Sequence, residues 1–155
     1  MTGKVDARLK ELNLTLPSAP AAVANYVPYV ISGNFIFVSG QLPMLDGTLH
    51  YPGIVGAQVT TDNAYEAAKL CALNIVAQIK GACGGDLDRV TRVVQLNGFV
   101  ASRADFGDHP KVVNGASDLM VAVFGEAGKH SRAAVGVASL PRGASVEVSA
   151  VFEIA

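Results

Sequence analysis

The sequence predicts an α+β fold, a two-layer sandwich in which two main helices cover one face of a single mixed sheet. Two long segments have the apolar spacing of amphipathic helices, and β-rich runs precede, separate and follow them. The 155 residues fit one domain, in which we expect residues 1–18 to form a helical N-terminal extension.

The N-terminal extension starts with a short helix. Val5, Leu9 and Leu12 recur at helical spacing and predict about two turns. Residues 1–14 are amphipathic and charged, and they lack the apolar region of a secretory signal peptide. No apolar run in the sequence is long enough to span a bilayer.

A strand hairpin follows the extension. The runs at 26–31 and 35–39 are rich in β-branched and aromatic residues, and the Ser32-Gly33-Asn34 segment between them is typical of a hairpin turn. Pro28 lies inside the first run, which favours an edge strand or a bulge because proline donates no hydrogen bond to a neighbouring strand.

A polar loop over 43–60 precedes the first long helix, for which Thr60, Thr61 and Asp62 are candidate N-caps. The glycines of GACGGDL end this helix. Apolar residues recur between these points at steps of three and four and predict one buried helix face, formed by Ala64, Ala68, Cys71, Ile75 and Ile79.

A strand at 90–100 and a second helix come next. Asp108 and Pro110 indicate where the helix begins. Its expected apolar face consists of Val112, Ala116, Met120 and Val123. Alternation along the strand predicts two faces, with Val94, Leu96 and Gly98 opposite Val93, Gln95 and Asn97.

Two strands, at 133–140 and 145–154, close the chain and are joined by Leu-Pro-Arg-Gly-Ala. The resulting order, ββαβαββ, leaves too few helices to cover both faces of the sheet. Half of the residues are hydrophobic and only 16% are charged. We therefore expect another subunit to cover the second face, because obligate interfaces resemble a protein core.

Charge and cysteine content narrow the function classes. The formal net charge is −1 and the basic residues are scattered, which argues against nucleic-acid binding. Cys71 and Cys83 form no CxxC or zinc spacing, so we expect free thiols in a reducing compartment, the cytoplasm. His50, His109 and His130 are far apart in the sequence and form no metal motif.

Two charged residues on the final strands are candidates for chemistry, since the sequence holds no GxSxG, HExxH or Walker motif. Arg132 is either a solvated or salt-bridged residue at a strand end, or a clamp whose planar guanidinium binds both oxygens of a carboxylate. Glu147 shares a strand face with Ser149 and Val151. It is an ordinary solvent-facing glutamate unless that face meets another subunit, where burial would raise its pKa and suit a proton relay.

Other polar residues are weaker candidates. Ser39 is either a hydrogen-bond donor in a cleft or a strand cap, and no motif links a histidine to it. Gln41, two residues later, belongs to the same strand end. Tyr26 is expected to be a core or interface ring whose hydroxyl needs a partner. Asn114 lies early in the second helix, where an asparagine is more often a surface residue than part of a site.

Read together, several segments resemble the RidA/YjgF (endoribonuclease L-PSP-like) family. They are, in order, APAAVANYV, GNFIFVSGQLP, the VNG of the second helix, SRAAVGVASLPRG and VEVSAV. The resemblance runs from about Ala19 to Val151. Two motifs make it most specific. The first is SGQLP, and the second is an arginine that precedes V-x-V-A-x-L-P, which is followed by V-E-V.

The resemblance implies a chorismate mutase-like fold that assembles as a homotrimer, with clefts at the subunit interfaces. It implies hydrolysis of 2-imino or enamine acids, which pyridoxal-phosphate enzymes release, to 2-oxo acids and ammonia. Such an activity removes damaging metabolites and uses no cofactor and no metal.

Matching the family's motifs residue by residue implies two catalytic residues. Arg132 would bind the substrate carboxylate, and Glu147 would lie near the attacking water. The same resemblance implies a set of substrate-binding residues, which are Arg132, Tyr26, Ser39, Asn114 and, mainly through its backbone, Ala134.

This chain departs from the family's pattern around the cleft. The N-terminal extension and the 43–60 loop are longer, and Ala134 replaces a common cysteine. His130 stands where a proline is common. It is either a second polar group at the mouth of the cleft or an ordinary loop histidine, and we favour the latter.

Four functions stay open, in decreasing order of support. The first is a deaminase of small 2-imino acids. The second is a hydrolase of another small molecule, such as an acyl or carbamate-type substrate. The third is a trimeric protein that binds a small carboxylate without turnover. An endoribonuclease comes last, because the charge balance argues against it.

Overall fold

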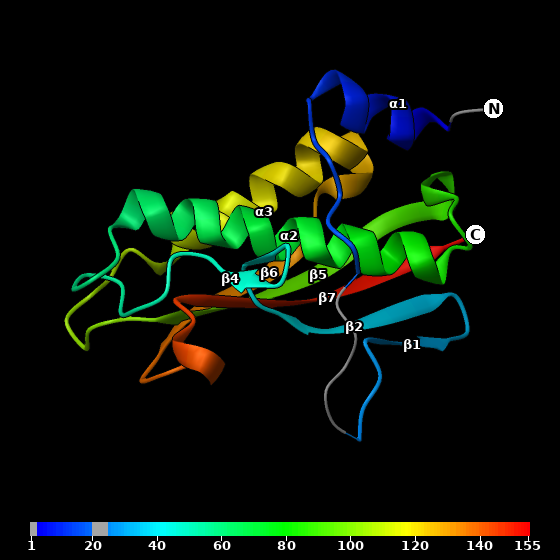
Figure 1. Ribbon diagram of the computed structural model, residues 1–155. Helices are drawn as coiled ribbons and strands as arrows, with labels where there is room; N and C mark the ends of the chain where they lie inside the picture. The colour runs from blue at the N-terminus through cyan, green and yellow to red at the C-terminus, as the bar shows by residue number, and fades with distance from the viewer. Residues whose placement is uncertain (1–2, 20–24) are drawn as a thin grey trace.

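The computed structural model describes residues 3–19 and 25–155. Two helices, α2 (Thr61–Ala82) and α3 (His109–Phe124), pack on one face of a sheet, and α1 (Lys4–Glu11) lies on the outer side of α3 (Figure 1). The sheet is mixed and five-stranded, and its strands from edge to edge are β1 (Tyr29–Ser32), β2 (Phe35–Gln41), β7 (Val146–Ile154), β5 (Val90–Ala101) and β6 (Ser131–Val137). This arrangement confirms the two-layer α+β class.

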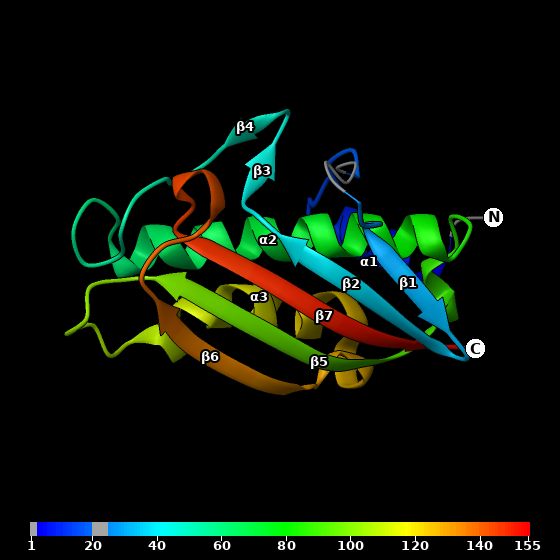
Figure 2. The ribbon, with the colours of Figure 1, turned by 90° about the horizontal axis from the view of Figure 1, so that it is seen from below.

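The strand order separates the last two strands of the chain. β5 and β6 are parallel and α3 connects them, whereas the other neighbouring pairs are antiparallel. The connection from β6 to β7 contains a short 3-10 helix, η3 (Pro141–Gly143), and β5 lies between the two strands. Figure 2 shows the sheet from the side opposite to the helices, with β1 and β6 at its edges.

Two further 3-10 helices lie in the connections, η1 (Leu87–Arg89) before β5 and η2 (Gly125–Gly128) after α3. The predicted 43–60 loop differs from expectation, because it contains a two-stranded hairpin of β3 (Met44–Leu45) and β4 (Thr48–Leu49). Asp46 and Gly47 form its turn, both at positive φ. An Asp-Gly pair at positive φ is typical of a tight hairpin turn.

The predicted start of the first strand is wrong by three residues, since β1 begins at Tyr29 rather than at residue 26. Pro28 is the reason, because it has no N–H with which to pair with β2. Its carbonyl oxygen still accepts a hydrogen bond from the backbone N–H of Ser39 at 2.9 Å. β1 is an edge strand, as the proline indicated.

The alternation predicted for β5 is wrong in its first half. Val93, and not Val94, is buried on the same side as Leu96. The register against β7 shifts between Val90 and Arg92 and again between Val93 and Gln95. Each bulge inserts a residue and reverses the alternation beyond it.

The core lies between the sheet and the helices α2 and α3. Alternate residues of β7 are buried in it, namely Val146, Val148, Ala150, Phe152 and Ile154. The opposite face of the sheet is open, and Phe35 and Phe37 are 40% and 48% exposed there. Large apolar side chains on an open sheet face are typical of an interaction surface.

Two glycines allow α3 to approach its neighbours closely. A Cβ at Gly98 of β5 would lie 2.5 Å from a side-chain carbon of Val113 in α3. A Cβ at Gly115 would lie 2.0 Å from the carbonyl oxygen of Tyr65 in α2. Tyr65 also donates a hydrogen bond of 2.7 Å to Asp118, and this bond raises the pKa of Tyr65 to about 12. α3 is thus fixed against both the sheet and α2.

Helix α1 is attached through its N-terminus. The Asp88 carboxylate accepts hydrogen bonds from the backbone N–H groups of Lys4 and Val5 at 2.8 and 2.9 Å. Both cysteines are free and buried, as expected. Within the part of the chain that the structure describes, no helix is both long and apolar enough to cross a membrane.

Candidate functional site

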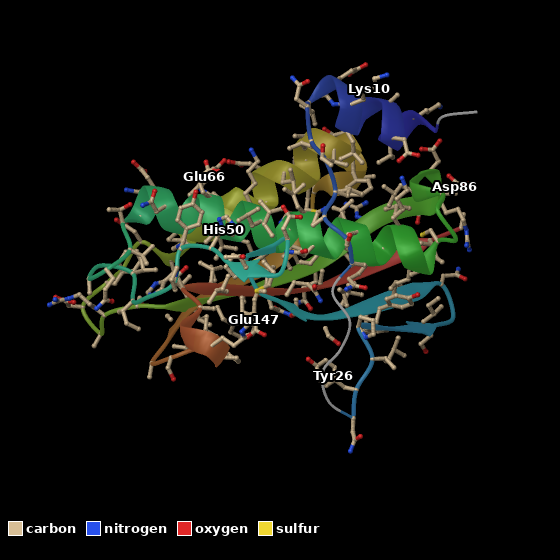
Figure 3. The ribbon with its side chains drawn as sticks, in the orientation of Figure 1. Lys10, Tyr26, His50, Glu66, Asp86 and Glu147 are labelled. Atoms are coloured by element: carbon tan, nitrogen blue, oxygen red, sulfur yellow. The ribbon has the colours of Figure 1, made fainter. Side chains whose placement is uncertain are left out.

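The candidate site residues fall into two groups on opposite faces of the sheet. Arg132 and Ala134 lie on edge strand β6 and face the side that α3 covers, where Asn114 bonds Arg132. Glu147 and Tyr26 lie on the open side, away from α2 and α3 (Figure 3). The two groups are described in turn.

Neutral acceptors of α3 hold the Arg132 guanidinium. Nη1 donates to Oδ1 of Asn114 at 2.8 Å and to Oγ of Ser117 at 3.1 Å. Nη2 donates to the carbonyl oxygen of Pro110 at 3.5 Å. Among the described residues, no carboxylate forms an ion pair with Arg132. The positive charge is therefore oriented but not neutralised, and Asn114 is more than a surface residue.

His130 extends this hydrogen-bond network. Its Nδ1 lies 2.6 Å from the carbonyl oxygen of Gly128, and its Nε2 lies 2.9 Å from Oγ of Ser117. A carbonyl oxygen only accepts, so Nδ1 carries the proton and, in the neutral ring, Nε2 accepts from the Ser117 hydroxyl. Ser117 in turn accepts from Arg132. His130 is therefore hydrogen-bonded to a partner of Arg132 and is not an isolated loop residue.

Glu147 lies against the backbone of Gly40 on the open side. The register of β2 against β7 shifts between Val38 and Gln41, so the SGQ segment bulges. A Cβ at Gly40 would lie 2.5 Å from Oε1 of Glu147, so any larger residue at this position would displace the carboxylate. Burial raises the pKa of Glu147 above its ordinary value, because the charged carboxylate loses hydration.

Ser39 supports the segment that precedes β1. Its hydroxyl donates to the carbonyl oxygen of Val27 at 2.7 Å, and its own carbonyl oxygen accepts from Nε2 of Gln41 at 3.0 Å. Tyr26, next to Val27, is 52% exposed, so in the single chain it is not a core residue. The hydroxyl of Ser39 thus positions the Tyr26 segment.

Within one chain, the two groups cannot face the same ligand. β5 lies between β6, which carries Arg132, and β7, which carries Glu147. Two strand spacings amount to about 10 Å. Because the two side chains also leave opposite faces of the sheet, a site that uses both needs a second copy of the chain.

Sequence reasoning missed Ser117 and Gly40. Ser117 lies three residues after Asn114, which is the spacing that places two side chains on one helix face. That spacing could have identified it. Gly40 had no signal of its own, since its contact with Glu147 depends on the register of β2 against β7. Among the described residues, no group of His, Cys, Asp or Glu side chains is arranged to hold a metal ion.

Comparisons with known proteins agree with this fold. A family model described as "YjgF/chorismate mutase-like, putative endoribonuclease" matches residues 6–153. Protein TCP17 of Trypanosoma cruzi is 51% identical over 154 residues, covering 99% of this chain and 96% of that protein. The crystal structure of an Agrobacterium tumefaciens protein of unknown function is 54% identical in sequence, with a TM-score of 0.92. The match covers 97% of this chain and 92% of that chain. An Escherichia coli 2-iminobutanoate/2-iminopropanoate deaminase is 30% identical over 139 residues, covering 86% and 91%.

Proposed function

The chain belongs to the YjgF/chorismate mutase-like family, and we propose that it hydrolyses reactive 2-imino acids to 2-oxo acids and ammonia. The name of the Escherichia coli relative supports this reaction class. The observation that carries the proposal is the Arg132 guanidinium, which neutral groups orient and which no carboxylate of the described residues neutralises.

Arg132 binds the substrate carboxylate. Its Nη1 is engaged by Asn114 and Ser117, and its Nε has no acceptor among the described residues. Nε and Nη2 can therefore donate two parallel hydrogen bonds to the two oxygens of a carboxylate. Hydrogen bonds to charged groups contribute about 1.5–3 kcal/mol each, enough to select 2-imino acids over uncharged imines.

Glu147 handles the protons of the reaction. The imine nitrogen takes a proton from solvent, and a water oxygen then bonds to the iminium carbon while Glu147 accepts one of the water's protons, which gives a neutral carbinolamine. Glu147 returns that proton to the amine nitrogen and the C–N bond breaks. Ammonia leaves as the C=O bond forms, and the hydroxyl proton of the carbinolamine returns to solvent. A raised pKa suits both transfers, because it makes the carboxylate a better base than ordinary glutamate.

A second copy completes the site. Arg132 of one chain and Glu147 of its partner would line one cleft, with Tyr26 and the SGQ segment beside Glu147. The exposed Phe35 and Phe37 support burial of the open sheet face by other subunits. We propose a closed homotrimer, since each interface then uses two different surfaces.

The test is imine hydrolysis. An amino-acid oxidase with catalase generates 2-imino acids from a panel of amino acids, and the rate of 2-oxo acid appearance is followed. The wild-type chain should accelerate the reaction, Arg132→Ala should not, and Arg132→Lys should recover little because lysine lacks the planar fork. If no imine in the panel is hydrolysed faster than in buffer, the proposal is wrong. Binding of 2-oxo acids would then favour the non-hydrolytic carboxylate-binding alternative.

A further inference from the structure

We propose that the Arg132 cleft continues along β6 into a second polar pocket, built on Ser102 and His109, which binds a second carboxylate of the substrate. This inference rests on the proposed function and names its substrate class, the 2-imino dicarboxylic acids.

The pocket lies at the end of β6 beside the first turn of α3. It is a cleft of about 540 Å³ whose lining includes Ser102, Arg103, Phe106, His109 and Gly136. None of its lining residues is acidic. The cleft is large enough for one end of a small ligand.

Three contacts fix the imidazole of His109 in the pocket. Its Nε2 lies 3.2 Å from Oγ of Ser102. The ring of Phe106 meets it edge-on, with centroids 5.1 Å apart. A Cβ at Gly136 would lie 2.5 Å from the same Nε2, so the absence of a side chain on β6 makes room for the imidazole. His109 is therefore held against the strand and not free in solvent.

The pocket lies on the same face of β6 as Arg132. Arg132, Ala134 and Gly136 occupy alternate positions of β6 and thus share the face that α3 covers. Nη2 of Arg132 donates to the carbonyl oxygen of Pro110, which directly follows His109 in the chain. The guanidinium and the imidazole consequently flank one stretch of strand, with the small side chain of Ala134 between them.

The chemistry of the pocket suits an anion. The Ser102 hydroxyl and Nε2 of His109 share one hydrogen bond, and Nδ1 of His109 has no partner among the residues described. In either tautomer of the neutral ring the pair keeps one donor for a ligand, which is the Ser102 hydroxyl when Nε2 is protonated and Nδ1–H when Nδ1 is protonated. Arg103 adds a positive charge. It pairs with Asp105 at 3.0 Å, but both side chains are mostly exposed, and such surface pairs exchange readily with a ligand. A carboxylate accepts from this donor, whereas an aliphatic chain leaves it without an acceptor.

Titration calorimetry with two ligands of equal shape tests the inference. The probes are 2-oxoglutarate and 5-methyl-2-oxohexanoate, in which two methyl groups replace the oxygens of the distal carboxylate. Wild type should bind 2-oxoglutarate at least about tenfold more tightly, as expected when one hydrogen-bonded charge is lost. His109→Ala and Ser102→Ala should bring the ratio of the two Kd values close to one. Gly136→Ala should also lower it, by displacing the imidazole.

The controls separate this inference from the proposed function. His50→Ala removes a histidine outside the pocket and should keep the wild-type Kd ratio. Arg132→Ala should weaken both ligands alike. A wild-type ratio near one, or a preference that survives in both His109→Ala and Ser102→Ala, would overturn the second pocket while leaving the clamp in place. Failure of both ligands to bind wild type would overturn the clamp and the pocket together.

Discussion

The orientation of Arg132 depends on a short network of neutral groups. Ser117 connects the guanidinium to His130, and Asn114 holds the same Nη1 atom. Ser117→Ala should raise KM for the best 2-imino acid about tenfold with little change in kcat, because it loosens a group that binds the substrate before and during reaction. Steady-state kinetics measure this split.

The matched control is Ser131→Ala on the adjacent position of β6. Its hydroxyl donates to the carbonyl oxygen of Val94 at 3.1 Å and contacts neither Arg132 nor His130. Equal effects of the two serine variants on KM would mean that the network around Arg132 does not position it.

The role proposed for Glu147 predicts an acidic limb in the pH profile of the reaction. Only the deprotonated carboxylate accepts a proton from water, so kcat/KM should fall as the pH drops through the raised pKa of Glu147. The midpoint of that fall should lie above 4.5, the ordinary value of a glutamate. Glu147→Gln should lower kcat about 100-fold or more, keep 2-oxo acid binding and remove this limb. A full rate in Glu147→Gln would exclude the residue from the mechanism.

The chemical types of the site residues could be predicted from the sequence, but their arrangement could not. A guanidinium and a carboxylate on two strands are candidates for a clamp and a proton carrier, and the family resemblance favours those roles. Their faces depend on β5 lying between β6 and β7, with parallel pairing on one side and antiparallel on the other. This order comes from packing over the whole sheet, and no local pattern around Arg132 or Glu147 encodes it.

The close packing of α3 against α2 requires a residue without a side chain at position 115. At Gly115 an added Cβ would meet the Tyr65 carbonyl oxygen at 2.0 Å, whereas at Gly81 of α2 it would meet nothing within 4 Å. Gly115→Ala should therefore lower the free energy of unfolding by about 1–3 kcal/mol, the usual cost of overpacking. Gly81→Ala should raise it by about 0.5–1 kcal/mol, because alanine suits a helix better. Denaturant unfolding of both variants measures the difference, and a stabilised Gly115→Ala would contradict the close packing.

Helix α1 should detach in acid. Hydrogen bonds from the backbone N–H groups of Val5 and Lys4 lower the pKa of Asp88 below 3.8. A lowered folded-state pKa means that the stabilisation is complete above 3.8 and is lost as the pH falls through the folded value. Asp88→Ala should show the detached state at neutral pH.

Hydrogen exchange of the amides of residues 4–11 measures this detachment. The control is Glu126→Gln, which removes an exposed carboxylate that pairs with Lys129 and has no hydrogen bond to α1. Protection of α1 that is equal in Asp88→Ala and wild type would show that another contact holds the helix.

Regular spacing made the main elements predictable, and irregular geometry produced the errors. The apolar faces of α2 and α3 were correct because helical spacing survives in any packing. The Asp46-Gly47 turn of the small hairpin had a recognisable signal that was not used. The bulges of β5 had none, because they arise from the register against β7.

At the scale of the whole molecule, the proposed site needs two chains. The open sheet face carries Glu147 together with exposed apolar residues such as Phe37, while Arg132 lies on edge strand β6 and faces α3. Burying that face would remove apolar surface from water and bring the edge of one copy to the face of the next. The proposed chemistry therefore requires the proposed assembly.

Mixing two inactive variants tests this claim most directly. Arg132→Ala and Glu147→Gln, co-refolded in equal amounts, should regain about a quarter of the wild-type activity, since random pairing makes one interface in four intact. Each variant refolded alone should stay inactive. If native mass spectrometry shows mixed assemblies and the mixture still has no activity, then the two residues do not meet between chains and the shared site is wrong.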